Sequence, residues 1–263
     1  MKVVILCGGV GSRMKEETEF RPKPMVMIGE KPILWHIMKH YAHFGFRDFV
    51  LALGYKGEMI REYFINYQLF NQDFTITLGK GHREVEVHET KRIDDWRVTL
   101  VDTGLSALKG ARIKRIEKYV PQEDTHFLMT YGDGVCNLDL NQLIAYHHSH
   151  GKLVTLTGVI PSMRFGEITA RPDGAVNFRE KDPSRAAMIN GGYYVVDRKI
   201  FQYLEDRDDQ DFEYGPLEEL SDKGEVMMRR HHDFWHCMDH LRDAEALNKM
   251  WGSGHAPWKL WEN

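Results

Sequence analysis

Short apolar runs alternate along this chain with segments of helical periodicity, and this alternation limits its fold more than any other feature. The predicted strands are Val3–Cys7, Asp48–Leu53, Thr125–Tyr131 and Lys152–Val159. Three of them are largely apolar, as expected when both faces of a sheet are covered. The predicted helices are Pro32–Phe44, Glu58–Tyr67, Leu105–Tyr119, Leu138–His150 and, near the end, about Leu241–Trp251. The alternation predicts an α/β, Rossmann-like fold with a mainly parallel mixed sheet flanked by helices.

The middle of the chain departs from this alternation. A hairpin is predicted from Phe74–Leu78 and Glu84–His88. Three further predicted strands have no helices between them, and they are Glu167–Ala170, Ala175–Glu180 and Gly192–Val196. We expect them to form an added β layer that shapes a substrate pocket. Because the chain has no internal repeat or low-complexity linker, residues 1–263 are expected to form a single domain.

Composition excludes several classes of partner. Lys and Arg number 35 against 39 Asp and Glu, a formal net charge of −4, so no overall attraction to nucleic acid or to an anionic membrane is expected. No run of 18 apolar residues is present for a membrane span, and no secretory signal is expected. Three scattered cysteines, Cys7, Cys136 and Cys237, suit a reducing compartment. A cytoplasmic enzyme is the expectation.

A glycine-rich turn follows the first predicted strand, where α/β folds bind ligands. It reads GGVGSR, with Gly8, Gly9 and Gly11 able to bring backbone N–H groups close to a phosphate. A dinucleotide fingerprint starting at Gly9 would require glycine where Met14 stands, and no Walker loop fits. A dinucleotide oxidoreductase is therefore disfavoured.

Ten residues later a lysine lies between two prolines. In RPKP, Pro22 and Pro24 stiffen the backbone around Lys23. A cation that is positioned in advance stabilises developing charge without reorganising. Together with Arg13, Lys23 predicts a site for an anionic substrate.

GGVGSR followed by RPKPM resembles the GGxGTR…PKP signature of the sugar-1-phosphate nucleotidylyltransferases. The resemblance extends over nearly the whole chain, through KPILWHIMKHY, GYKGEMIREYF, VTLVDTG, FLMTYGDGV, AMINGGYYVV, FWHCMDHLRD and APWKLWEN. It is closest to the cytidylyltransferase branch of that family. This resemblance implies CTP and a sugar 1-phosphate as substrates, with α-D-glucose 1-phosphate as the favoured acceptor, Mg²⁺ as cofactor and a homo-oligomeric assembly.

Two carboxylates are candidates for the metal. Asp133 in TYGDGV ends a predicted strand between two glycines, which leaves room for a hard cation with oxygen ligands. Asp239 follows 106 residues later, and its alternative role is the N-cap of the last helix. The resemblance implies that this pair holds Mg²⁺. A less favoured alternative is zinc, since His236 and His240 are spaced i, i+4. His231, His232 and Cys237 lie near them in sequence, with the two histidines expected in a strand and His236 in a loop.

The resemblance also implies residues for the two substrates. The sugar 1-phosphate would bind Gly166 of RFG, the pair Glu180 and Lys181, and the pair Asn190 and Gly191. The nucleotide would contact Gly8, Gly9, Gly11, Ser12, and Thr103 and Gly104 of VDTG. Thr103 is a candidate partner for the pyrimidine edge. Departures from the family pattern at Glu167, Asp182 and His236-Cys237 leave the sugar open.

The implied reaction is an attack by a phosphate oxygen of the sugar 1-phosphate on the α-phosphorus of CTP. The attacking group is already an anion at pH 7, so no general base is required. Arg13 would stabilise the leaving pyrophosphate, Lys23 the α-phosphate and Lys181 the sugar phosphate. The alternatives are another sugar phosphate or nucleotide, a metal-dependent glycosyltransferase and a non-catalytic nucleotide sensor. A glycosyltransferase would normally carry a DxD motif, whereas Asp133 is followed by Gly-Val.

An aromatic segment, HAPWKLWEN, ends the sequence. Trp258 and Trp261 would be large exposed apolar side chains if nothing packed on them. A partner subunit or their own chain could cover them, and both possibilities stay open.

Overall fold

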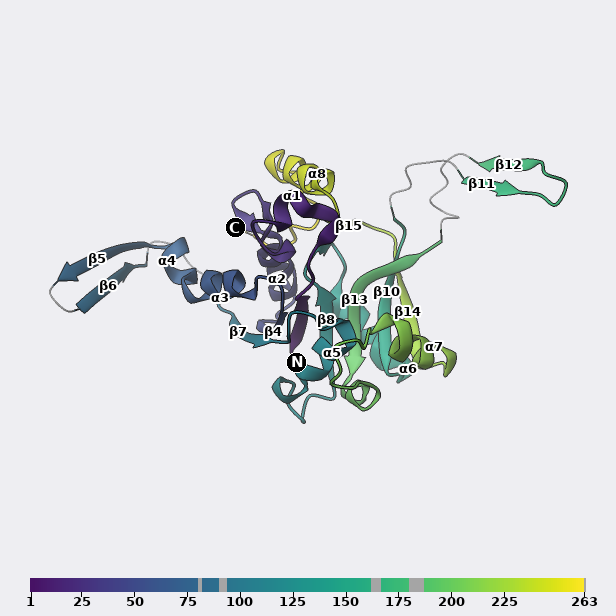
Figure 1. The fold of residues 1–263 in the computed structure, drawn as a ribbon, viewed down its shortest axis with the longest axis horizontal. Coiled ribbons are helices and arrows are strands. Elements are labelled where there is room, and N and C mark those ends of the chain that lie inside the picture. Colours follow the sequence, from purple (N-terminus) through teal and green to yellow (C-terminus); the bar gives the residue numbers. More distant parts are fainter. Residues whose placement is uncertain (80–81, 90–93, 162–166, 180–186, 263) are drawn as a thin grey trace.

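A seven-stranded sheet forms the centre of the computed structural model, which describes residues 1–79, 82–89, 94–161, 167–179 and 187–262 (Figure 1). Its strands are β1 (Val3–Cys7), β4 (Asp48–Leu53), β7 (Arg97–Asp102), β8 (His126–Tyr131), β10 (Val154–Val159), β13 (Ile189–Asp197) and β14 (Val226–His231). They lie in the order β14-β10-β13-β8-β1-β4-β7. Only β13, among these strands, runs antiparallel to its neighbours. The mostly parallel mixed sheet predicted from the alternation is confirmed.

The first strand shows why its sequence is continuously apolar. Successive side chains of a strand point to opposite faces of the sheet. Val3, Ile5 and Cys7 belong to one buried cluster, while Val4 and Leu6 belong to a second cluster on the other face. Because both faces of β1 are covered, its sequence is apolar at every position. The residues that follow β1 lie at the carboxyl edge of the sheet.

Helices cover both faces. They are α1 (Lys15–Thr18), α2 (Ile33–His43), α3 (Gly57–Ile65), α4 (Tyr67–Asn71), α5 (Lys109–Arg115), α6 (Leu140–His150), α7 (Glu218–Asp222) and α8 (Leu241–Gly252). The cluster behind Val3 contains residues of α2, α6 and α8, and the cluster behind Val4 contains residues of α5 and α7. No helix within the described ranges is long and apolar enough to cross a bilayer.

Two predicted helices differ from the observed ones. Residues 105–108 are not helical, because Leu108 has an extended backbone and α5 begins only at Lys109. The predicted helix over 58–67 ends at Ile65, and a separate α4 follows. The strand β7 was not predicted, since Arg97 and Thr99 interrupt its apolar pattern.

The predicted added β layer is wrong in its composition. Tyr193–Val196 are buried on both faces, so β13 belongs to the central sheet between β8 and β10. β11 (Glu167–Ala170) and β12 (Val176–Arg179) form a separate two-stranded sheet, which lies apart from the central sheet (Figure 1). The predicted hairpin is confirmed as β5 (Asp73–Gly79) and β6 (His82–His88). The remaining short pairs are β2 (Met27–Ile28) with β3 (Lys31–Pro32), and β9 (Gly134–Cys136) with β15 (Trp235–Cys237).

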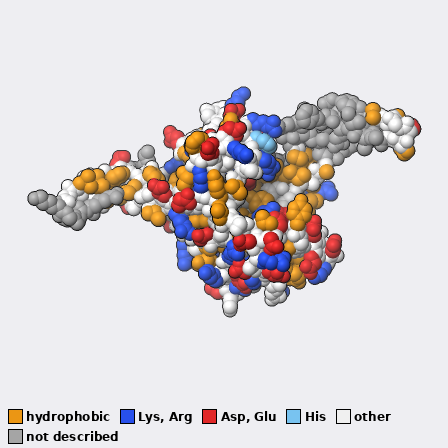
Figure 2. All heavy atoms as spheres, viewed as in Figure 1, with side chains coloured by type: hydrophobic (Ala, Val, Ile, Leu, Met, Phe, Trp, Pro, Cys, Tyr) orange, Lys and Arg blue, Asp and Glu red, His pale blue; other side chains and the backbone are white. Residues whose placement is uncertain are grey.

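The β5–β6 hairpin projects from the sheet beyond α4, and Figure 2 shows hydrophobic side chains along it. Every residue of β5 is exposed, among them Phe74, Ile76 and Leu78. An apolar strand with exposed side chains departs from the usual alternation of buried and solvated positions. The hairpin therefore takes no part in the core that positions the cavity described below.

The aromatic segment near the end of the sequence packs on its own chain. Trp258 is fully buried and Trp261 is 8% exposed. The indole of Trp258 stacks on Phe234 and Trp251, with ring centroids 5.5 and 6.3 Å apart. The sequence left open whether a partner subunit or the chain itself covers Trp258 and Trp261, and the structure shows packing on the chain itself.

His36 joins this segment to α2. The indole N–H of Trp258 donates to Nδ1 of His36 at 3.3 Å, so the proton of the neutral ring is on Nε2, which donates to the Ile28 carbonyl at 2.9 Å. Burial lowers the pKa of His36 from 6.5 to about 4, although backbone hydrogen bonds oppose the shift. The folded protein therefore keeps this imidazole neutral.

We expect this histidine to make stability depend on pH. The imidazole of His36 binds a proton near pH 6.5 in the unfolded chain and only near pH 4 in the folded chain. Its contribution to the free energy of unfolding is therefore fully present above pH 6.5 and falls as the pH decreases towards 4. At pH 5 the contribution is a loss of about 2 kcal/mol in the free energy of unfolding. Urea titrations at pH 7.5 and pH 5 measure it. His36→Gln should reduce the difference between the two pH values, while the exposed His255→Gln should not, and an equal difference in all three proteins would contradict the assignment.

Candidate active site

A cavity of about 680 Å³ opens where β1 and β8 end. This volume falls within the range usual for small-molecule sites. The cavity is lined by ten of the residues predicted from the sequence, namely Gly8, Gly9, Gly11, Ser12, Arg13, Lys23, Asp133, Asn190, Gly191 and Asp239. They come from segments more than 200 residues apart, and the parallel sheet brings them to one edge.

Each of the three glycines in the first loop has a different structural role. A Cβ on Gly8 would lie 2.2 Å from the Arg112 guanidinium, so Gly8 leaves room for an arginine as well as for a ligand. Gly9 is exposed, and a Cβ added to it would have no neighbour within 4 Å, which leaves its backbone open to the cavity. Gly11 has φ +65°, a left-handed conformation that favours glycine, and it precedes the 3-10 helix η1 (Ser12–Met14). In this loop, Gly8 has no space for a side chain, Gly9 faces open space, and Gly11 has a left-handed backbone.

Lys23 is held at the start of a 3-10 helix, η2 (Lys23–Met25), and only 9% of it is exposed. Its ammonium donates to Oδ2 of Asp133 at 2.7 Å and to Oδ1 of Asp239 at 2.6 Å. Burial alone would lower the pKa of Lys23, but the charge of Asp133 and the hydrogen bonds to both carboxylates raise it above its ordinary value. The stiff segment predicted from the two prolines therefore presents a permanently charged ammonium to the cavity.

Arg13 reaches the same carboxylate from the first loop. Its Nη1 donates to Oδ2 of Asp239 at 2.9 Å, and 68% of its side chain is exposed. Burial would raise the pKa of Asp239, yet the hydrogen bond from Lys23 and the charges of Lys23 and Arg13 lower it below its ordinary value. Asp239 is therefore ionised at neutral pH, and the two cations predicted from the sequence converge on it.

Main-chain pairing fixes the two carboxylates beside each other. Gly134 of β9 pairs with Cys237 of β15, and the Met238 N–H donates to the Asp133 carbonyl at 2.8 Å. Asp239 is not the N-cap of α8. Its N–H and that of His240 instead donate to Oδ2 of Asp243, at 3.0 and 2.8 Å. The Asp239 carboxylate is therefore directed to the cavity and not to the helix.

The donor set suits a divalent cation. Within the described part of the chain, one group of three ligand atoms lies within 4.8 Å of one another, and it comprises Asp133, Cys237 and Asp239. Two carboxylates fit Mg²⁺, which prefers oxygen ligands and keeps several waters. The less favoured zinc cluster is not formed by the described histidines, and His236 lies in β15, whereas a loop was expected.

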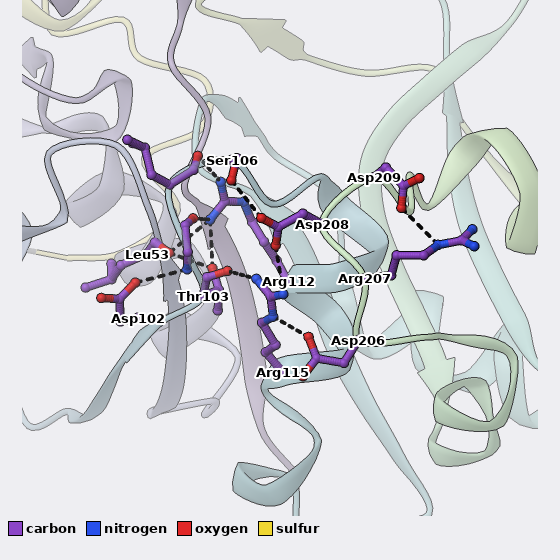
Figure 3. A network of polar contacts seen from close by, with 12 residues as sticks. Leu53, Asp102, Thr103, Ser106, Arg112, Arg115, Asp206, Arg207, Asp208 and Asp209 are labelled. Carbon is purple, nitrogen blue, oxygen red and sulfur yellow. Dashed lines mark hydrogen bonds and ion pairs between the residues drawn. The ribbon is translucent and has the colours of Figure 1, made fainter.

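Arg112 of α5 is a site residue that the sequence did not reveal (Figure 3). It is 4% exposed and lines the cavity. Its guanidinium donates to the carbonyls of Gly8 and Leu53, each at 3.0 Å, and of Gly104 at 2.7 Å. It also donates to the Thr103 hydroxyl at 2.8 Å. One buried cation thus ties the first glycine loop to the loop after β7.

Thr103 lies inside this network. Its side chain is fully buried and its hydroxyl donates to the Leu53 carbonyl at 2.5 Å. Neither Thr103 nor Gly104 lines the cavity. This position does not favour the predicted contact between Thr103 and the pyrimidine edge. The residues that follow, 105–109, line the cavity in their place.

A second arginine supports the same loop from outside (Figure 3). Arg115 donates to the Thr103 carbonyl at 2.7 Å and pairs with Asp206 at 2.6 Å and Asp208 at 2.7 Å. Ser106 donates to the other oxygen of Asp208 at 2.7 Å. These contacts fix the loop after β7 against residues 206–208, so the wall of the cavity is held by charge-assisted hydrogen bonds.

β8 and β13 supply further residues that line the cavity. Asn190 and Gly191 line it as predicted, and the Trp235 indole donates to the Gly191 carbonyl at 2.8 Å. Asn190 Oδ1 accepts the Gly192 N–H at 3.0 Å, and its Nδ2 donates to the hydroxyl of Tyr194. The predicted sugar-binding residues Gly166, Glu180 and Lys181 lie outside the described residues.

A polar cluster lies next to Asn190. The hydroxyls of Tyr131 and Tyr194 are 2.6 Å apart, and Tyr131 donates to Glu213. Lys109 pairs with Glu213 at 2.6 Å. Burial raises the pKa of Glu213, as does the hydrogen bond to Asp211, while Lys109 opposes the shift. Lys109, Tyr131 and Asp211 line the cavity, and none of the three was a site residue predicted from the sequence.

The arrangement is suited to a reaction between two anions. Arg13, Lys23 and Lys109 bring positive charge to the cavity, and the pair Asp133 and Asp239 can hold a divalent cation. The described residues that line the cavity suggest no step that needs a side-chain base. Positioning and neutralisation of phosphate charge are the means of catalysis that this set of residues can supply.

Comparison with known proteins agrees with this chemistry. A family model described as nucleotidyl transferase matches residues 2–239. The chain is 48% identical to a glucose-1-phosphate cytidylyltransferase of Salmonella typhimurium over 262 residues, covering 100% of both chains. It is 42% identical to a probable glucose-1-phosphate cytidylyltransferase of Bacillus subtilis, covering 99% of this chain and 100% of the other. In fold it is similar to HddC from Yersinia pseudotuberculosis complexed with GMP-PN, with a TM-score of 0.66, 24% identity, and coverage of 95% and 99%.

Proposed function

We propose that this chain, which belongs to the nucleotidyl transferase family, transfers the cytidylyl group of CTP to α-D-glucose 1-phosphate and releases pyrophosphate. The observation that carries the proposal is the convergence of Arg13 and Lys23 on Asp239, beside Asp133, in one cavity. The cytidylyltransferases among its relatives, 42% to 48% identical over their whole length, support the choice of nucleotide and sugar.

The residues of this chain would act mainly by position. The open backbone at Gly9 would receive the triphosphate, with Arg13 neutralising the leaving pyrophosphate and Lys23 the α-phosphate. The sugar phosphate would enter from the side of Asn190 and Gly191, and its phosphate oxygen would attack the α-phosphorus directly. Arg112 would keep the two nucleotide loops at their separation. The predicted role of Lys181 on the sugar phosphate stays a prediction.

Asp133 and Asp239 would hold the metal, for which we propose Mg²⁺. When bound, such an ion supplies Lewis-acid stabilisation of phosphate charge. Lys23 donates to both carboxylates, so a bound metal would compete with its ammonium for them. The homo-oligomeric assembly and the cytoplasmic location expected from the sequence stay predictions.

A pyrophosphate-release screen tests the proposal. The four common ribonucleoside triphosphates and dTTP are each combined with glucose, mannose, galactose and N-acetylglucosamine 1-phosphates in the presence of Mg²⁺. We expect CTP with glucose 1-phosphate to exceed the other pairs clearly. Turnover with another pair would assign a different nucleotide or sugar, and CTP binding without turnover for any acceptor would identify a nucleotide sensor.

Two glycine variants separate ligand contact from stability. Gly9→Ala places a methyl group in open space, so the free energy of unfolding should stay within about 0.5 kcal/mol, while KM for CTP rises because the backbone no longer approaches the phosphates closely. Gly8→Ala meets the Arg112 guanidinium at 2.2 Å and should lower stability itself. Urea unfolding and steady-state kinetics measure both. An unchanged KM in Gly9→Ala would remove the first loop from nucleotide binding.

A further inference from the structure

We propose that His126 and His148 form a second metal site, which takes a transition-metal ion of the Zn²⁺ class. His126 begins β8, and His148 lies in the last turn of α6. The Nε2 atoms of the two imidazoles are 3.0 Å apart. The proposal is independent of the transfer reaction, because β8 reaches the substrate cavity at its other end, where Tyr131 lies.

The separation of the two nitrogens is that of two ligands on one ion. Zinc binds imidazole nitrogens at about 2.0 to 2.1 Å, so two of them on the same ion stand roughly 2.9 to 3.4 Å apart. The observed 3.0 Å between His126 and His148 lies within this range. Because His148 is exposed, its ring can turn until both lone pairs meet at one point. The backbone of β8 and α6 therefore does not need to move when an ion binds.

Thr125 can fix the tautomer that His126 needs. Its hydroxyl oxygen lies 2.9 Å from Nδ1 of His126 and can accept the N–H there, which leaves the lone pair on Nε2. A ligating histidine usually donates its other ring N–H in this way. Burial and the neighbouring His148 lower the pKa of His126, although Asp197 opposes the shift, so the ring is neutral at pH 7. In neutral His148, the proton moves to Nδ1, where water accepts it, and the Nε2 lone pair bonds the metal.

The two other histidines in the last turn of α6 are bound elsewhere. The Lys152 N–H donates to Nδ1 of His150, so His150 carries its proton on Nε2 and donates it to the Thr155 hydroxyl at 2.8 Å. That hydroxyl in turn donates to Nδ1 of His147 at 2.9 Å. The described residues place no third protein ligand beside the proposed pair. Water would complete the coordination, as it does in open zinc sites.

The local charge favours a cation. Asp197 pairs with His126 across β13 and β8, and Asp124 precedes His126 by two residues. The C-terminal end of α6, whose last carbonyls carry partial negative charge, lies at the same place. The N-terminal amine of the chain, 3.5 Å from Asp124, offsets part of this charge. Imidazole ligands suit zinc, copper and nickel, whereas Mg²⁺ takes oxygen ligands, so the pair selects the softer ions.

Zn²⁺ itself is the probe, and its binding is measured by competition with a chelating indicator in excess Mg²⁺. We expect His126→Gln and His148→Gln each to weaken binding at one zinc site by at least about tenfold. His255→Gln is the matched control, since His255 is also exposed, and it should bind zinc as the wild type does. Asp133→Asn, which lacks one carboxylate of the catalytic pair, should keep the histidine site. Circular dichroism confirms that the variants fold.

The position of the ion is the second readout. In crystals soaked with Zn²⁺, anomalous scattering at the zinc edge should give a peak about 2.1 Å from both Nε2 atoms. His148→Gln should keep the wild-type rate of pyrophosphate release, because His148 does not line the substrate cavity. Equal zinc affinity in the wild type and in both histidine variants would overturn the proposal. A soaked crystal with zinc elsewhere and no peak between the two rings would also overturn it.

Discussion

Lys23→Ala is expected to lower kcat for pyrophosphate release by at least about a hundredfold, because the loss of one preorganised donor to a developing charge costs about 3 kcal/mol. The ammonium is 2.7 and 2.6 Å from the two carboxylates and is held by a proline-flanked turn, so no other described lysine takes its place. Steady-state kinetics with saturating CTP and sugar phosphate measure the effect. Lys15→Ala, an exposed lysine in α1 that does not line the cavity, should leave kcat unchanged.

Metal affinity distinguishes the two tasks that Lys23 could have. If it acts on the nucleotide, Lys23→Ala should bind Mg²⁺ at least as tightly as the wild type, because the ammonium no longer competes for the Asp133 and Asp239 oxygens. If it serves only to hold the carboxylates together, Mg²⁺ affinity should fall along with kcat. Near-normal turnover in the variant would remove Lys23 from the mechanism.

Trp258→Ala is expected to reduce the free energy of unfolding by about 3–5 kcal/mol, the usual cost of removing a fully buried aromatic side chain. The indole lies between Phe234 and Trp251 and donates to His36, so its loss leaves a cavity and removes one hydrogen bond. Urea unfolding measures the change.

Trp258→Phe is the matched variant. It keeps an aromatic ring but loses the donor to His36, so we expect a loss of about 1 kcal/mol. Phe234 directly precedes β15, and damage at Trp258 should therefore also disturb the Cys237–Asp239 segment and weaken metal binding. A Trp258→Ala protein as stable as the wild type would mean that this segment does not pack on its own chain.

The local sequence pattern was sufficient to predict a strand where both faces of that strand are buried. β1 and β4 have the bounds that their apolar runs predicted, because a strand covered on both faces has a nearly continuous apolar sequence. β13 was assigned to the wrong layer. Its sequence is that of a buried strand, but the strands that pair with it, β8 and β10, are separated from it in sequence by other elements, and pairing of this kind has no local signal.

In the site too, residues in motifs were predicted, and residues that depend on contacts distant in sequence were not. Arg13, Lys23, Asp133 and Asp239 were predicted through motifs, and the structure brings them together. Arg112 was missed because most of its partners are backbone carbonyls up to 104 residues away, and carbonyls carry no sequence signature. Thr103 was predicted from a motif alone, and its burial follows from a hydrogen bond to Leu53 that the motif does not contain.

The central claim is that Arg13, Lys23 and the two carboxylates act on a single triphosphate. A crystal structure with CTP and Mg²⁺, without the acceptor, tests it most directly. The account predicts phosphate oxygens within about 3.2 Å of the Arg13 guanidinium and the Lys23 ammonium, with the metal on Asp133 and Asp239. A triphosphate bound away from both cations, or a metal bound without either carboxylate, would contradict it.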